Sequence, residues 1–239
     1  MTVALLSDVH GNLVALEAVL AALRPVEQLW VTGDTVGYGP DPSDVLALLR
    51  ERGALLVAGN HDRAVATGAG IEFFNRHAAD AARLHARWLS AEERDLLAAL
   101  PETAERAAFT LCHGSLRDPL WEYVFTPGAA AACLERAATA HGCCGHTHVP
   151  AFFGGDGTSL GHVQPGDGAS FDLPKRALVN PGSVGQPRDG DPRAAYALLD
   201  LERSRVTFHR VAYDVAETQR RIHARGLPDI LADRLAYGL

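Results

Sequence analysis

Short apolar segments alternate with helix-like segments through the first 60 residues, and this alternation constrains the fold more than any other feature. Apolar runs at 3–6, 28–32 and 54–58 have the length and composition of buried strands. Between them, Asn12 stands as N-cap before a leucine stripe, and Pro42 suits the first position of a second helix. Strands that alternate with helices of this length pair in parallel, so the sequence predicts an α/β layer architecture.

The middle of the chain is predicted to be mostly helical. Residues 64–106 are predicted to form a helical insertion, with one helix at about 75–88. A second helix begins at Ser90, which forms a capping box with Glu93. A strand is then expected at 107–112, followed by an alanine-rich helix near 128–139 and a strand that leads to Cys144.

The last third is predicted to contain short strands and turns. A loosely glycine-rich loop covers 154–170, and a strand pair is expected at 194–200 and 204–211. Asp214 is placed to cap a helix, so 214–239 is expected to form a helical tail. No linker interrupts the pattern, and a single domain over 1–239 is the expectation.

Composition excludes several classes of protein. The formal net charge is −7, which disfavours a long nucleic-acid groove but not a local cationic pocket. No apolar run approaches the roughly 18 residues of a membrane span, and no signal peptide is visible. Four cysteines in 239 residues do not make a secreted disulfide framework, so a reduced, cytoplasmic protein is expected.

Metal-binding residue types follow the predicted strands. The carboxyl ends of parallel strands share one crevice, so residues distant in sequence can converge there. Asp8 and His10, and again His146 and His148, are two residues apart, which predicts that each pair lies on one side of an extended segment. The set comprises Ser7-Asp8-Val9-His10, Gly33-Asp34, Gly59-Asn60-His61-Asp62, His113-Gly114 and Gly145-His146-Thr147-His148.

The donor types indicate which ions would bind. Carboxylates, imidazoles and an amide, without an obligate thiolate, suit Mn, Fe, Ni or Zn better than a structural zinc–cysteine site. Two divalent ions, two aspartates and a bridging hydroxide would leave a net charge of about +1, which attracts a phosphoryl oxygen. A pair of metal ions can also hold both the nucleophile and the phosphate.

Each motif alone has an ordinary explanation. Asp-x-His is common, Gly33-Asp34 can be a plain turn, and His146-x-His148 can be a solvated strand edge. Gly-Asn-His-Asp is less usual, although its polar residues could cap a helix. Five of the eleven histidines fall in these motifs at predicted strand ends, and this co-occurrence favours a two-metal centre.

The five blocks resemble the signature of the calcineurin-like metallophosphoesterase superfamily over residues 3–211. The sequences 33–40 and 180–185 are similar to a small prokaryotic branch that contains phosphodiesterases and relatives of diadenosine tetraphosphatase and serine/threonine phosphatases. The resemblance implies a fold of two mixed β-sheets packed face to face and flanked by helices.

The resemblance also implies roles for particular residues. Asp8, His10, Asp34 and His148 would hold one metal ion. Asp34 would bridge to a second ion, completed by Asn60, His113 and His146. His61 would contact substrate and protonate the leaving oxygen. A histidine suits this task because its pKa lies near neutral, and Asp62 or a nearby carboxylate could tune it. Manganese is the ion most expected in both positions.

Several residues near the motifs have two open interpretations. Arg63 and Arg117 each follow a block closely and are candidates to bind substrate phosphate, as is Arg188 with less support; a surface ion pair is the alternative. Tyr38 either lines the cleft or packs in its loop. Asn180 is expected to organise a turn near the site.

The remaining candidates are cysteines beside the motifs, aromatic residues of the insertion and histidines on predicted helices. Cys112 alternates with His113 and is therefore expected in the core, as are Cys143 and Cys144. Phe73, Phe74 and Trp88 could form a lid over the substrate, or belong to a core or an interface. Three further histidines are predicted on helices as surface or core residues, namely His77, His85 and His223.

The function expected from the sequence is hydrolysis of a phosphodiester by a metal-bridging hydroxide. Two enzymatic alternatives use the same centre, a phosphoprotein phosphatase with a more open cleft and a dinucleoside polyphosphate hydrolase. The partner is accordingly a small phosphorylated molecule or a phosphoprotein, and an oligomer is compatible with the sequence. A protein-binding scaffold of the same fold is less favoured because His61 and every expected ligand are present.

Overall fold

The computed structural model describes residues 1–156 and 159–239. Its strands are β1 (Thr2–Leu6), β2 (Gln28–Val31), β3 (Leu55–Leu56), β4 (Thr103–Arg106), β5 (Phe109–Cys112), β6 (His141–Cys143), β7 (Ala151–Gly155), β8 (Gly161–Val163), β9 (Ser170–Asp172), β10 (Arg176–Asn180), β11 (Ala194–Asp200) and β12 (Arg205–Val211). Its helices are α1 (Leu13–Ala22), α2 (Pro42–Glu51), α3 (Asn60–Thr67), α4 (Arg76–Trp88), α5 (Ala91–Ala98), α6 (Pro127–Leu134), α7 (Val215–Ala224) and α8 (Asp229–Asp233), with short 3-10 helices η1 (Ile71–Phe73) and η2 (Arg234–Tyr237).

The strands form two mixed sheets of six strands each. The first has the order β3-β2-β1-β11-β12-β9, and the second has the order β4-β5-β6-β10-β7-β8. In the first, β1, β2 and β3 are parallel to one another, and in the second, β5, β6 and β10 are parallel. The remaining pairings are antiparallel. The expected two-sheet fold flanked by helices is therefore confirmed.

Alternation along β1 explains why the sheets pack face to face. Val3 and Leu5 point into the core between the sheets, where they join Trp30, Phe109 and residues of both sheets. Ala4 and Leu6 point the other way, toward the apolar faces of α1 and α2. A strand that is buried on both faces must be apolar at every position, as 3–6 is.

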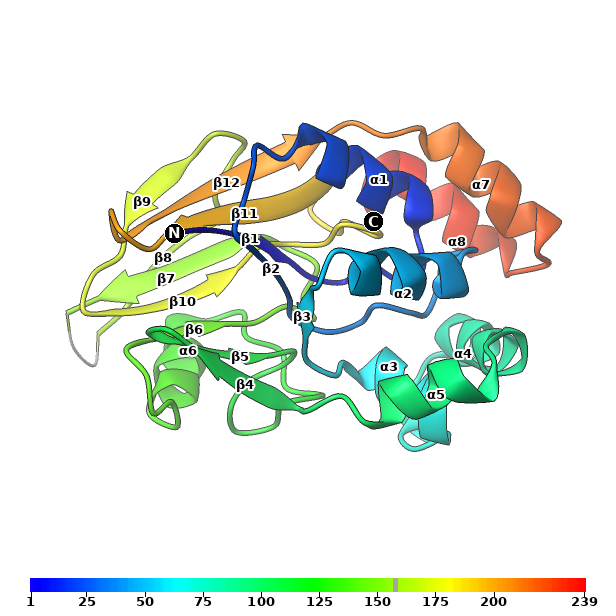
Figure 1. The fold of residues 1–239 in the computed structure, drawn as a ribbon, viewed down its shortest axis with the longest axis horizontal. Helices are drawn as coiled ribbons and strands as arrows, with labels where there is room; N and C mark the ends of the chain where they lie inside the picture. The colour runs from blue at the N-terminus through cyan, green and yellow to red at the C-terminus, as the bar shows by residue number, and fades with distance from the viewer. Residues whose placement is uncertain (157–158) are drawn as a thin grey trace.

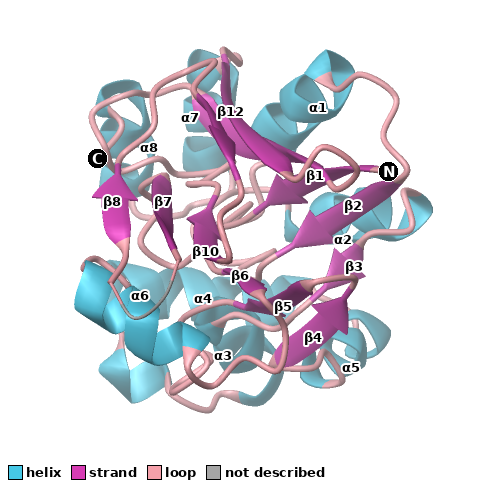
Figure 2. Cartoon of the chain, turned by 90° about the vertical axis from the view of Figure 1, so that its left-hand side faces the viewer, coloured by secondary structure: helices cyan, strands magenta, loops and turns pink. Residues whose placement is uncertain are grey.

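Helices cover the outer faces of the sandwich (Figures 1 and 2). Cys133 and Leu134 of α6 pack on the second sheet, against Phe153 and Leu178. Strands occupy one half of the molecule in Figure 1, whereas α3, α4, α5, α7 and α8 occupy the other. The loops that follow β1, β2 and β3 therefore lie between the two halves.

Three parts of the chain differ from the sequence-based expectation. Residues 64–106 are not wholly helical, because 103–106 form β4, which pairs with β5 at the edge of the second sheet. The glycine-rich loop expected at 154–170 contains β8, paired with β7, while its residues 157–158 lie outside the described part of the chain. The helix expected near 128–139 ends at Leu134. Among the described residues, no helix is long and apolar enough to cross a membrane.

Candidate metal centre

The polar motifs follow five strands that belong to two parallel runs, one in each sheet. Asp8, Asp34 and Asn60 follow β1, β2 and β3, while His113 and His146 follow β5 and β6. Because the carboxyl ends of both parallel runs meet between the sheets, the side chains converge from two directions. Every residue expected to bind metal is at most 4% exposed, namely Asp8, His10, Asp34, Asn60, His113, His146 and His148.

The backbone at these residues is strained. Among described non-glycine residues, eight have positive φ, and six of them belong to this site: Asp8, His10, Asp34, Tyr38, His146 and His148. The expectation that Asp8 and His10, and likewise His146 and His148, lie along extended segments is therefore wrong. Left-handed backbone costs about 1–3 kcal/mol per residue, and such strain concentrates at functional sites.

Two glycines let the loops approach this closely. A Cβ on Gly59 would lie 2.0 Å from Asp34 Oδ1, and a Cβ on Gly37, whose φ is +92°, would lie 2.3 Å from His61 Nδ1. Any larger residue would displace a site side chain, so glycine is required here for space as well as for backbone freedom.

The first group of donors comprises Asp8, His10 and His148. His10 Nδ1 lies 2.9 Å from the Val36 carbonyl oxygen, and His148 Nδ1 lies 2.6 Å from that of Gln186. A carbonyl oxygen only accepts, so each Nδ1 carries the hydrogen and each Nε2 presents a lone pair. The two Nε2 atoms face each other at 3.1 Å, and His148 Nε2 lies 3.3 Å from Asp8 Oδ1, a buried atom without a hydrogen-bond partner among the described residues.

The second group comprises Asp34, His113 and His146, with Asn60 beside them. His113 Nδ1 donates to the Thr32 carbonyl and His146 Nε2 donates to that of Trp121. Their other ring nitrogens, His113 Nε2 and His146 Nδ1, are 2.9 Å apart. His113 Nε2 is also 3.3 Å from Asp34 Oδ2 and 3.2 Å from Asn60 Oδ1.

Both groups therefore fit divalent cations. Acceptor atoms repel one another at such distances unless positive charge lies among them, and backbone carbonyls that fix the ring orientation are the usual outer partners of metal-binding histidines. Asp34 lies between the groups, since its Oδ2 is 3.6 Å from His10 Nε2 as well as near His113.

The pKa values of the buried aspartates and histidines also indicate that the site favours bound cations. Burial raises the pKa of Asp8 to about 7. Burial would also raise the pKa of Asp34, but the charges of His113 and His61 outweigh it and hold that pKa well below its ordinary value. Burial lowers the pKa of His113, whereas the Asp34 carboxylate more than compensates and raises it to about 9. A proton on His113 thus neutralises charge that metal ions would otherwise balance.

The amide of His61 donates to Asp34 Oδ1 at 2.9 Å, and its ring forms a third group of possible metal donors with His10 and Asp34. Its Nδ1 is buried and has no hydrogen-bond partner among the described residues. Its ring stacks on Phe74 at 4.3 Å and lies 4.5 Å from the ring of Tyr38. Burial lowers its pKa to about 4. The ring is consequently held in place by packing, with Nδ1 buried against Gly37, so proton transfer would fall to Nε2.

Asp62 does not touch the His61 ring in this structure. Its Oδ1 accepts hydrogen bonds from the amides of Thr35 and Val36 and from the Thr35 hydroxyl, and its Oδ2 accepts one from the Gly59 amide. The carboxylate therefore ties the loop after β2 to the start of α3. Asp62 is therefore a positioning residue, and the nearby carboxylate that raises the pKa of His61 against the effect of burial is Asp34.

The arginines expected to bind substrate are turned away from the site. Arg63 donates to the carbonyl oxygens of Ala98 and Leu100 and lies 3.5 Å from Glu102. Arg117 is exposed and pairs with Glu122. Both follow a motif closely in sequence, but α3 directs Arg63 toward the segment between α5 and β4, and the loop after β5 places Arg117 at the surface. Arg188, by contrast, lines the pocket over the metal-binding groups.

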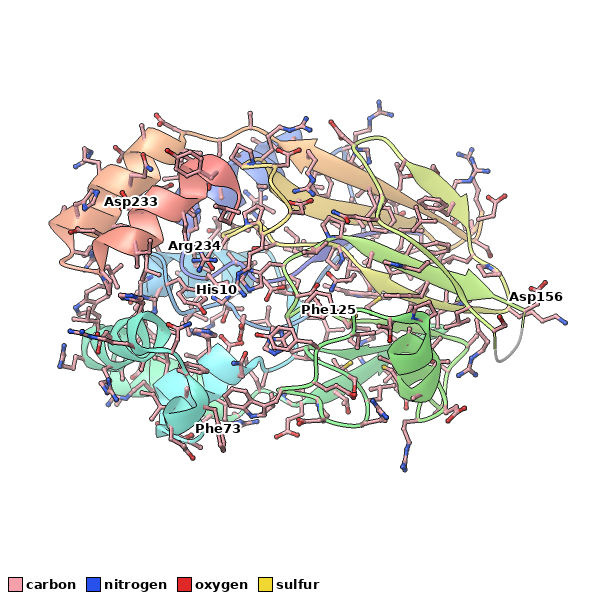
Figure 3. The ribbon with its side chains drawn as sticks, turned by 180° about the vertical axis from the view of Figure 1, so that it is seen from behind. His10, Phe73, Phe125, Asp156, Asp233 and Arg234 are labelled. Atoms are coloured by element: carbon pink, nitrogen blue, oxygen red, sulfur yellow. The ribbon has the colours of Figure 1, made fainter. Side chains whose placement is uncertain are left out.

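Aromatic side chains wall this pocket. Tyr38, Phe73 and Phe74 line it together with Trp121 and Tyr123. Tyr123 stacks on His146 with ring centroids 3.9 Å apart. Figure 3 shows His10 in the middle of the molecule, with Phe73 and Phe125 on the side of the insertion and second sheet and Arg234 on the opposite side. Trp88 packs against His85 and Arg225 instead of lining the pocket.

Trp121 and Tyr123 were not expected from the sequence. The available signal was the aromatic run Trp121–Phe125, which follows the His113 block within a few residues and is too short to form a core strand. Other expectations agree with the structure: Asn180 donates to the Gly145 carbonyl and accepts from the Gly182 amide, so it organises the turn. Cys112, Cys143 and Cys144 are buried in the core, and His77 and His223 are exposed.

The two-sheet sandwich holds a buried cluster of carboxylate and imidazole donors that could bind metal ions, as in a hydrolase of phosphate esters. The calcineurin-like phosphoesterase superfamily domain matches residues 1–204. The chain belongs to this superfamily.

Two relatives align with nearly the whole chain, and a third aligns with part of it. A metallophosphoesterase from Sphaerobacter thermophilus has a TM-score of 0.92 and 42% sequence identity, and the alignment covers 100% of this chain and 99% of that one. An uncharacterized protein from Methanocaldococcus jannaschii is 33% identical over 99% of this chain and 98% of its own length. A symmetrical bis(5'-nucleosyl)-tetraphosphatase from Pectobacterium carotovorum is 46% identical over 77 residues, which span 30% of this chain and 27% of that protein.

Proposed function

We propose that this chain hydrolyses a phosphate ester, most directly a phosphodiester, at a centre of two divalent ions for which manganese is the expected metal. The supporting observation is the convergence of imidazole lone pairs and two aspartates, with each ring fixed by a backbone carbonyl. Asp8, His10 and His148 would hold one ion, and Asn60, His113 and His146 the other. Asp34, which lies between the groups, would bind both.

The bound ions would supply positive charge for the phosphoryl oxygens and a nucleophile at neutral pH. The chain supplies the remaining chemistry. His61 is neutral in the free site at pH 7, because burial lowers its pKa to about 4. A bound phosphate anion favours the protonated ring, so His61 gains its proton with the substrate and gives it to the leaving oxygen.

The pocket walls favour a small phosphorylated substrate over a phosphoprotein. Phe73, Phe74, Trp121 and Tyr123 line the space above the donors and narrow it, whereas a phosphoprotein needs an open, shallow surface. The partial similarity to symmetrical bis(5'-nucleosyl)-tetraphosphatases makes a dinucleoside polyphosphate the second candidate substrate.

A substrate panel tests the proposal. The protein would be loaded with Mn²⁺ and assayed with bis-p-nitrophenyl phosphate, p-nitrophenyl phosphate, a dinucleoside tetraphosphate and a phosphopeptide. We expect turnover of the diester and slower or no turnover of the phosphopeptide. Inactivity on all four with metal bound would contradict hydrolysis.

His61→Ala separates an enzyme from a protein-binding scaffold. Removal of a proton donor should lower kcat by about 10²–10⁴-fold while the metal content stays unchanged. His77→Ala, at an exposed helical position, is the matched control. Equal turnover in the two variants would contradict a catalytic role for His61.

A further inference from the structure

Exposed aromatic side chains gather at the mouth of the pocket over the metal-binding groups. Four aromatic residues of the described chain are exposed, and three of them belong to η1 or to 121–125, the two segments that line this mouth. These three are Phe73, Tyr123 and Phe125. Phe73 is 72% exposed, although a phenyl ring gains most from burial. Exposed apolar surface concentrated beside a site indicates a binding surface.

The two segments are distant in sequence and meet at the ring of Trp121. A Cβ on Gly70, the residue before η1, would lie 2.4 Å from Trp121 Cζ2, so η1 begins directly against this ring. The ring centroids of Phe73 and Phe74 lie 5.5 and 5.6 Å from that of Trp121. The mouth of the pocket therefore has a continuous aromatic edge, built from the helical insertion and from the loop after β5.

Residues 121–125 are anchored to the metal-binding groups. The Trp121 carbonyl accepts a hydrogen bond from His146 Nε2, and the Tyr123 ring stacks on the ring of the same histidine. Val124 is buried in the cluster between α6 and the second sheet, while Tyr123 and Phe125 on either side of it are exposed. The aromatic rings are thus held at a fixed place relative to a metal-binding residue, as a binding surface for part of a substrate requires.

The other segment is anchored beside His61. Phe74 stacks on the His61 ring, whereas Phe73 meets Trp121 at an interplanar angle of 78° and has no stacked partner among the described residues. The ester group whose oxygen His61 would protonate accordingly extends past Phe74, toward Phe73 and Trp121. The exposed Phe73 ring is available to stack on that group.

The chemistry of the mouth indicates which kind of group it takes. The side chains of Phe73, Phe74, Trp121 and Tyr123 are uncharged and planar. Such rings bind another flat ring by stacking, and every nucleobase offers one. A peptide would bring backbone N–H and C=O groups that need hydrogen-bond partners, which phenyl rings do not supply. A second copy of the chain would cover the entrance that the substrate must use.

We propose that Phe73 and Trp121 form a stacking site for the nucleobase of a nucleotide whose phosphate lies at the metal-binding groups. The substrate class is then a phosphate ester of a nucleoside. This inference rests on the proposed function, since that function places the phosphate.

Equilibrium binding of matched ligands tests the stacking site. The Mn²⁺-loaded protein would carry His61→Asn, which limits turnover and keeps a side chain against Phe74. It would be titrated by calorimetry with adenosine 5'-monophosphate, uridine 5'-monophosphate and ribose 5-phosphate at a fixed free Mn²⁺ concentration. We expect adenosine monophosphate to bind about tenfold more tightly than ribose 5-phosphate, which lacks the base, and uridine monophosphate to lie between them because its ring is smaller.

Variants assign the gain from the base to particular rings. Phe73→Ala should reduce the gain to twofold or less and leave ribose 5-phosphate affinity within about twofold, whereas Phe73→Tyr should retain the gain. Trp121→Phe, with a smaller ring, should reduce the gain two- to threefold. Tyr237→Ala removes an exposed aromatic side chain that does not line the pocket, and it should bind all three ligands like the parent.

Several results would overturn the stacking site. These are equal affinity for the three ligands, a gain that survives in Phe73→Ala, or an equal loss for ribose 5-phosphate and the nucleotides. A dimer that sedimentation detects in the wild type but not in Phe73→Ala would also overturn it, because a second copy would then cover these rings. A full gain in Trp121→Phe would overturn the contribution of Trp121. Absence of hydrolysis in the substrate panel, with the gain from the base intact, would instead contradict the proposed function alone.

Discussion

Asp62 connects two loops of the metal centre through four hydrogen bonds. Three donors converge on Oδ1 and the Gly59 amide donates to Oδ2, so both oxygens must be acceptors. Both loops carry expected ligands, since Asp34 precedes Thr35 and Asn60 follows Gly59. The carboxylate therefore fixes the distance between Asp34 and Asn60.

Asp62→Asn should lower the free energy of unfolding by about 1–3 kcal/mol, because an amide group would place N–H against a buried N–H donor. Urea unfolding measured beside the wild type checks this. Unchanged stability combined with a shifted pH–rate profile would instead indicate that Asp62 acts directly in proton transfer.

The identity of the site residues is more predictable than their backbone. Asp8, His10, His146 and His148 were expected in the site from residue type and spacing, and the structure brings them together. The prediction of an extended backbone is wrong because the sequence does not indicate which aspartates and histidines adopt a positive φ. Arg63 shows a related limit, since adjacency to a motif does not reveal which face of α3 a side chain occupies.

Helix α4 is anchored to the loop of Tyr38 by a buried histidine. His85 Nδ1 accepts from the Gly37 amide at 3.0 Å, and His85 Nε2 donates to the Gly39 carbonyl at 2.8 Å. Only the neutral ring can make both bonds, because a proton on Nδ1 would face the Gly37 N–H. The sequence indicated a helix at this position but not which of its histidines faces inward.

Burial lowers the pKa of His85 to about 3, below the ordinary value of 6.5. The unfolded chain therefore binds a proton below pH 6.5 that the folded chain does not bind, and stability decreases as the pH falls from 6.5 toward 3. His85→Gln lacks this titration. We expect the stability difference between wild type and His85→Gln to shrink by about 2 kcal/mol between pH 7 and pH 5.

Chemical denaturation at both pH values, with Mn²⁺ present, measures this difference. His77→Gln on the same helix is the control, because His77 is exposed and the variant should follow the wild type at both pH values. A constant difference between wild type and His85→Gln would show that the buried ring does not resist protonation.

The architecture brings two separate parallel runs to one centre. β1, β2 and β3 belong to one sheet and β5 and β6 to the other, so the site forms only when the sheets pack together. Alternating strands and helices predicted the first run, and resemblance to a known family predicted the second sheet. The edge strand β4, the aromatic lining of the pocket and the packing of η2 against Tyr38 depend on long-range contacts, which local periodicity does not encode.

Metal binding should accordingly stabilise the whole molecule. Ions that bind only the folded arrangement raise the free energy of unfolding by about 2.7 kcal/mol at a hundredfold excess over Kd. We expect removal of metal by a chelator to lower Tm, and readdition of Mn²⁺ to restore it. An unchanged Tm, despite metal loss confirmed by elemental analysis, would contradict coupling between the sheets and the ions.

The most direct test is the metal stoichiometry of the wild type and of Asp34→Asn, determined by titration of the metal-free proteins with Mn²⁺. Asp34 lies between the two donor groups, 3.3 Å from His113 Nε2 and 3.6 Å from His10 Nε2. The wild type should bind two ions per chain, and Asp34→Asn should lose affinity for both together. A single ion in the wild type, or the loss of only one ion in the variant, would contradict a two-metal centre bridged by Asp34.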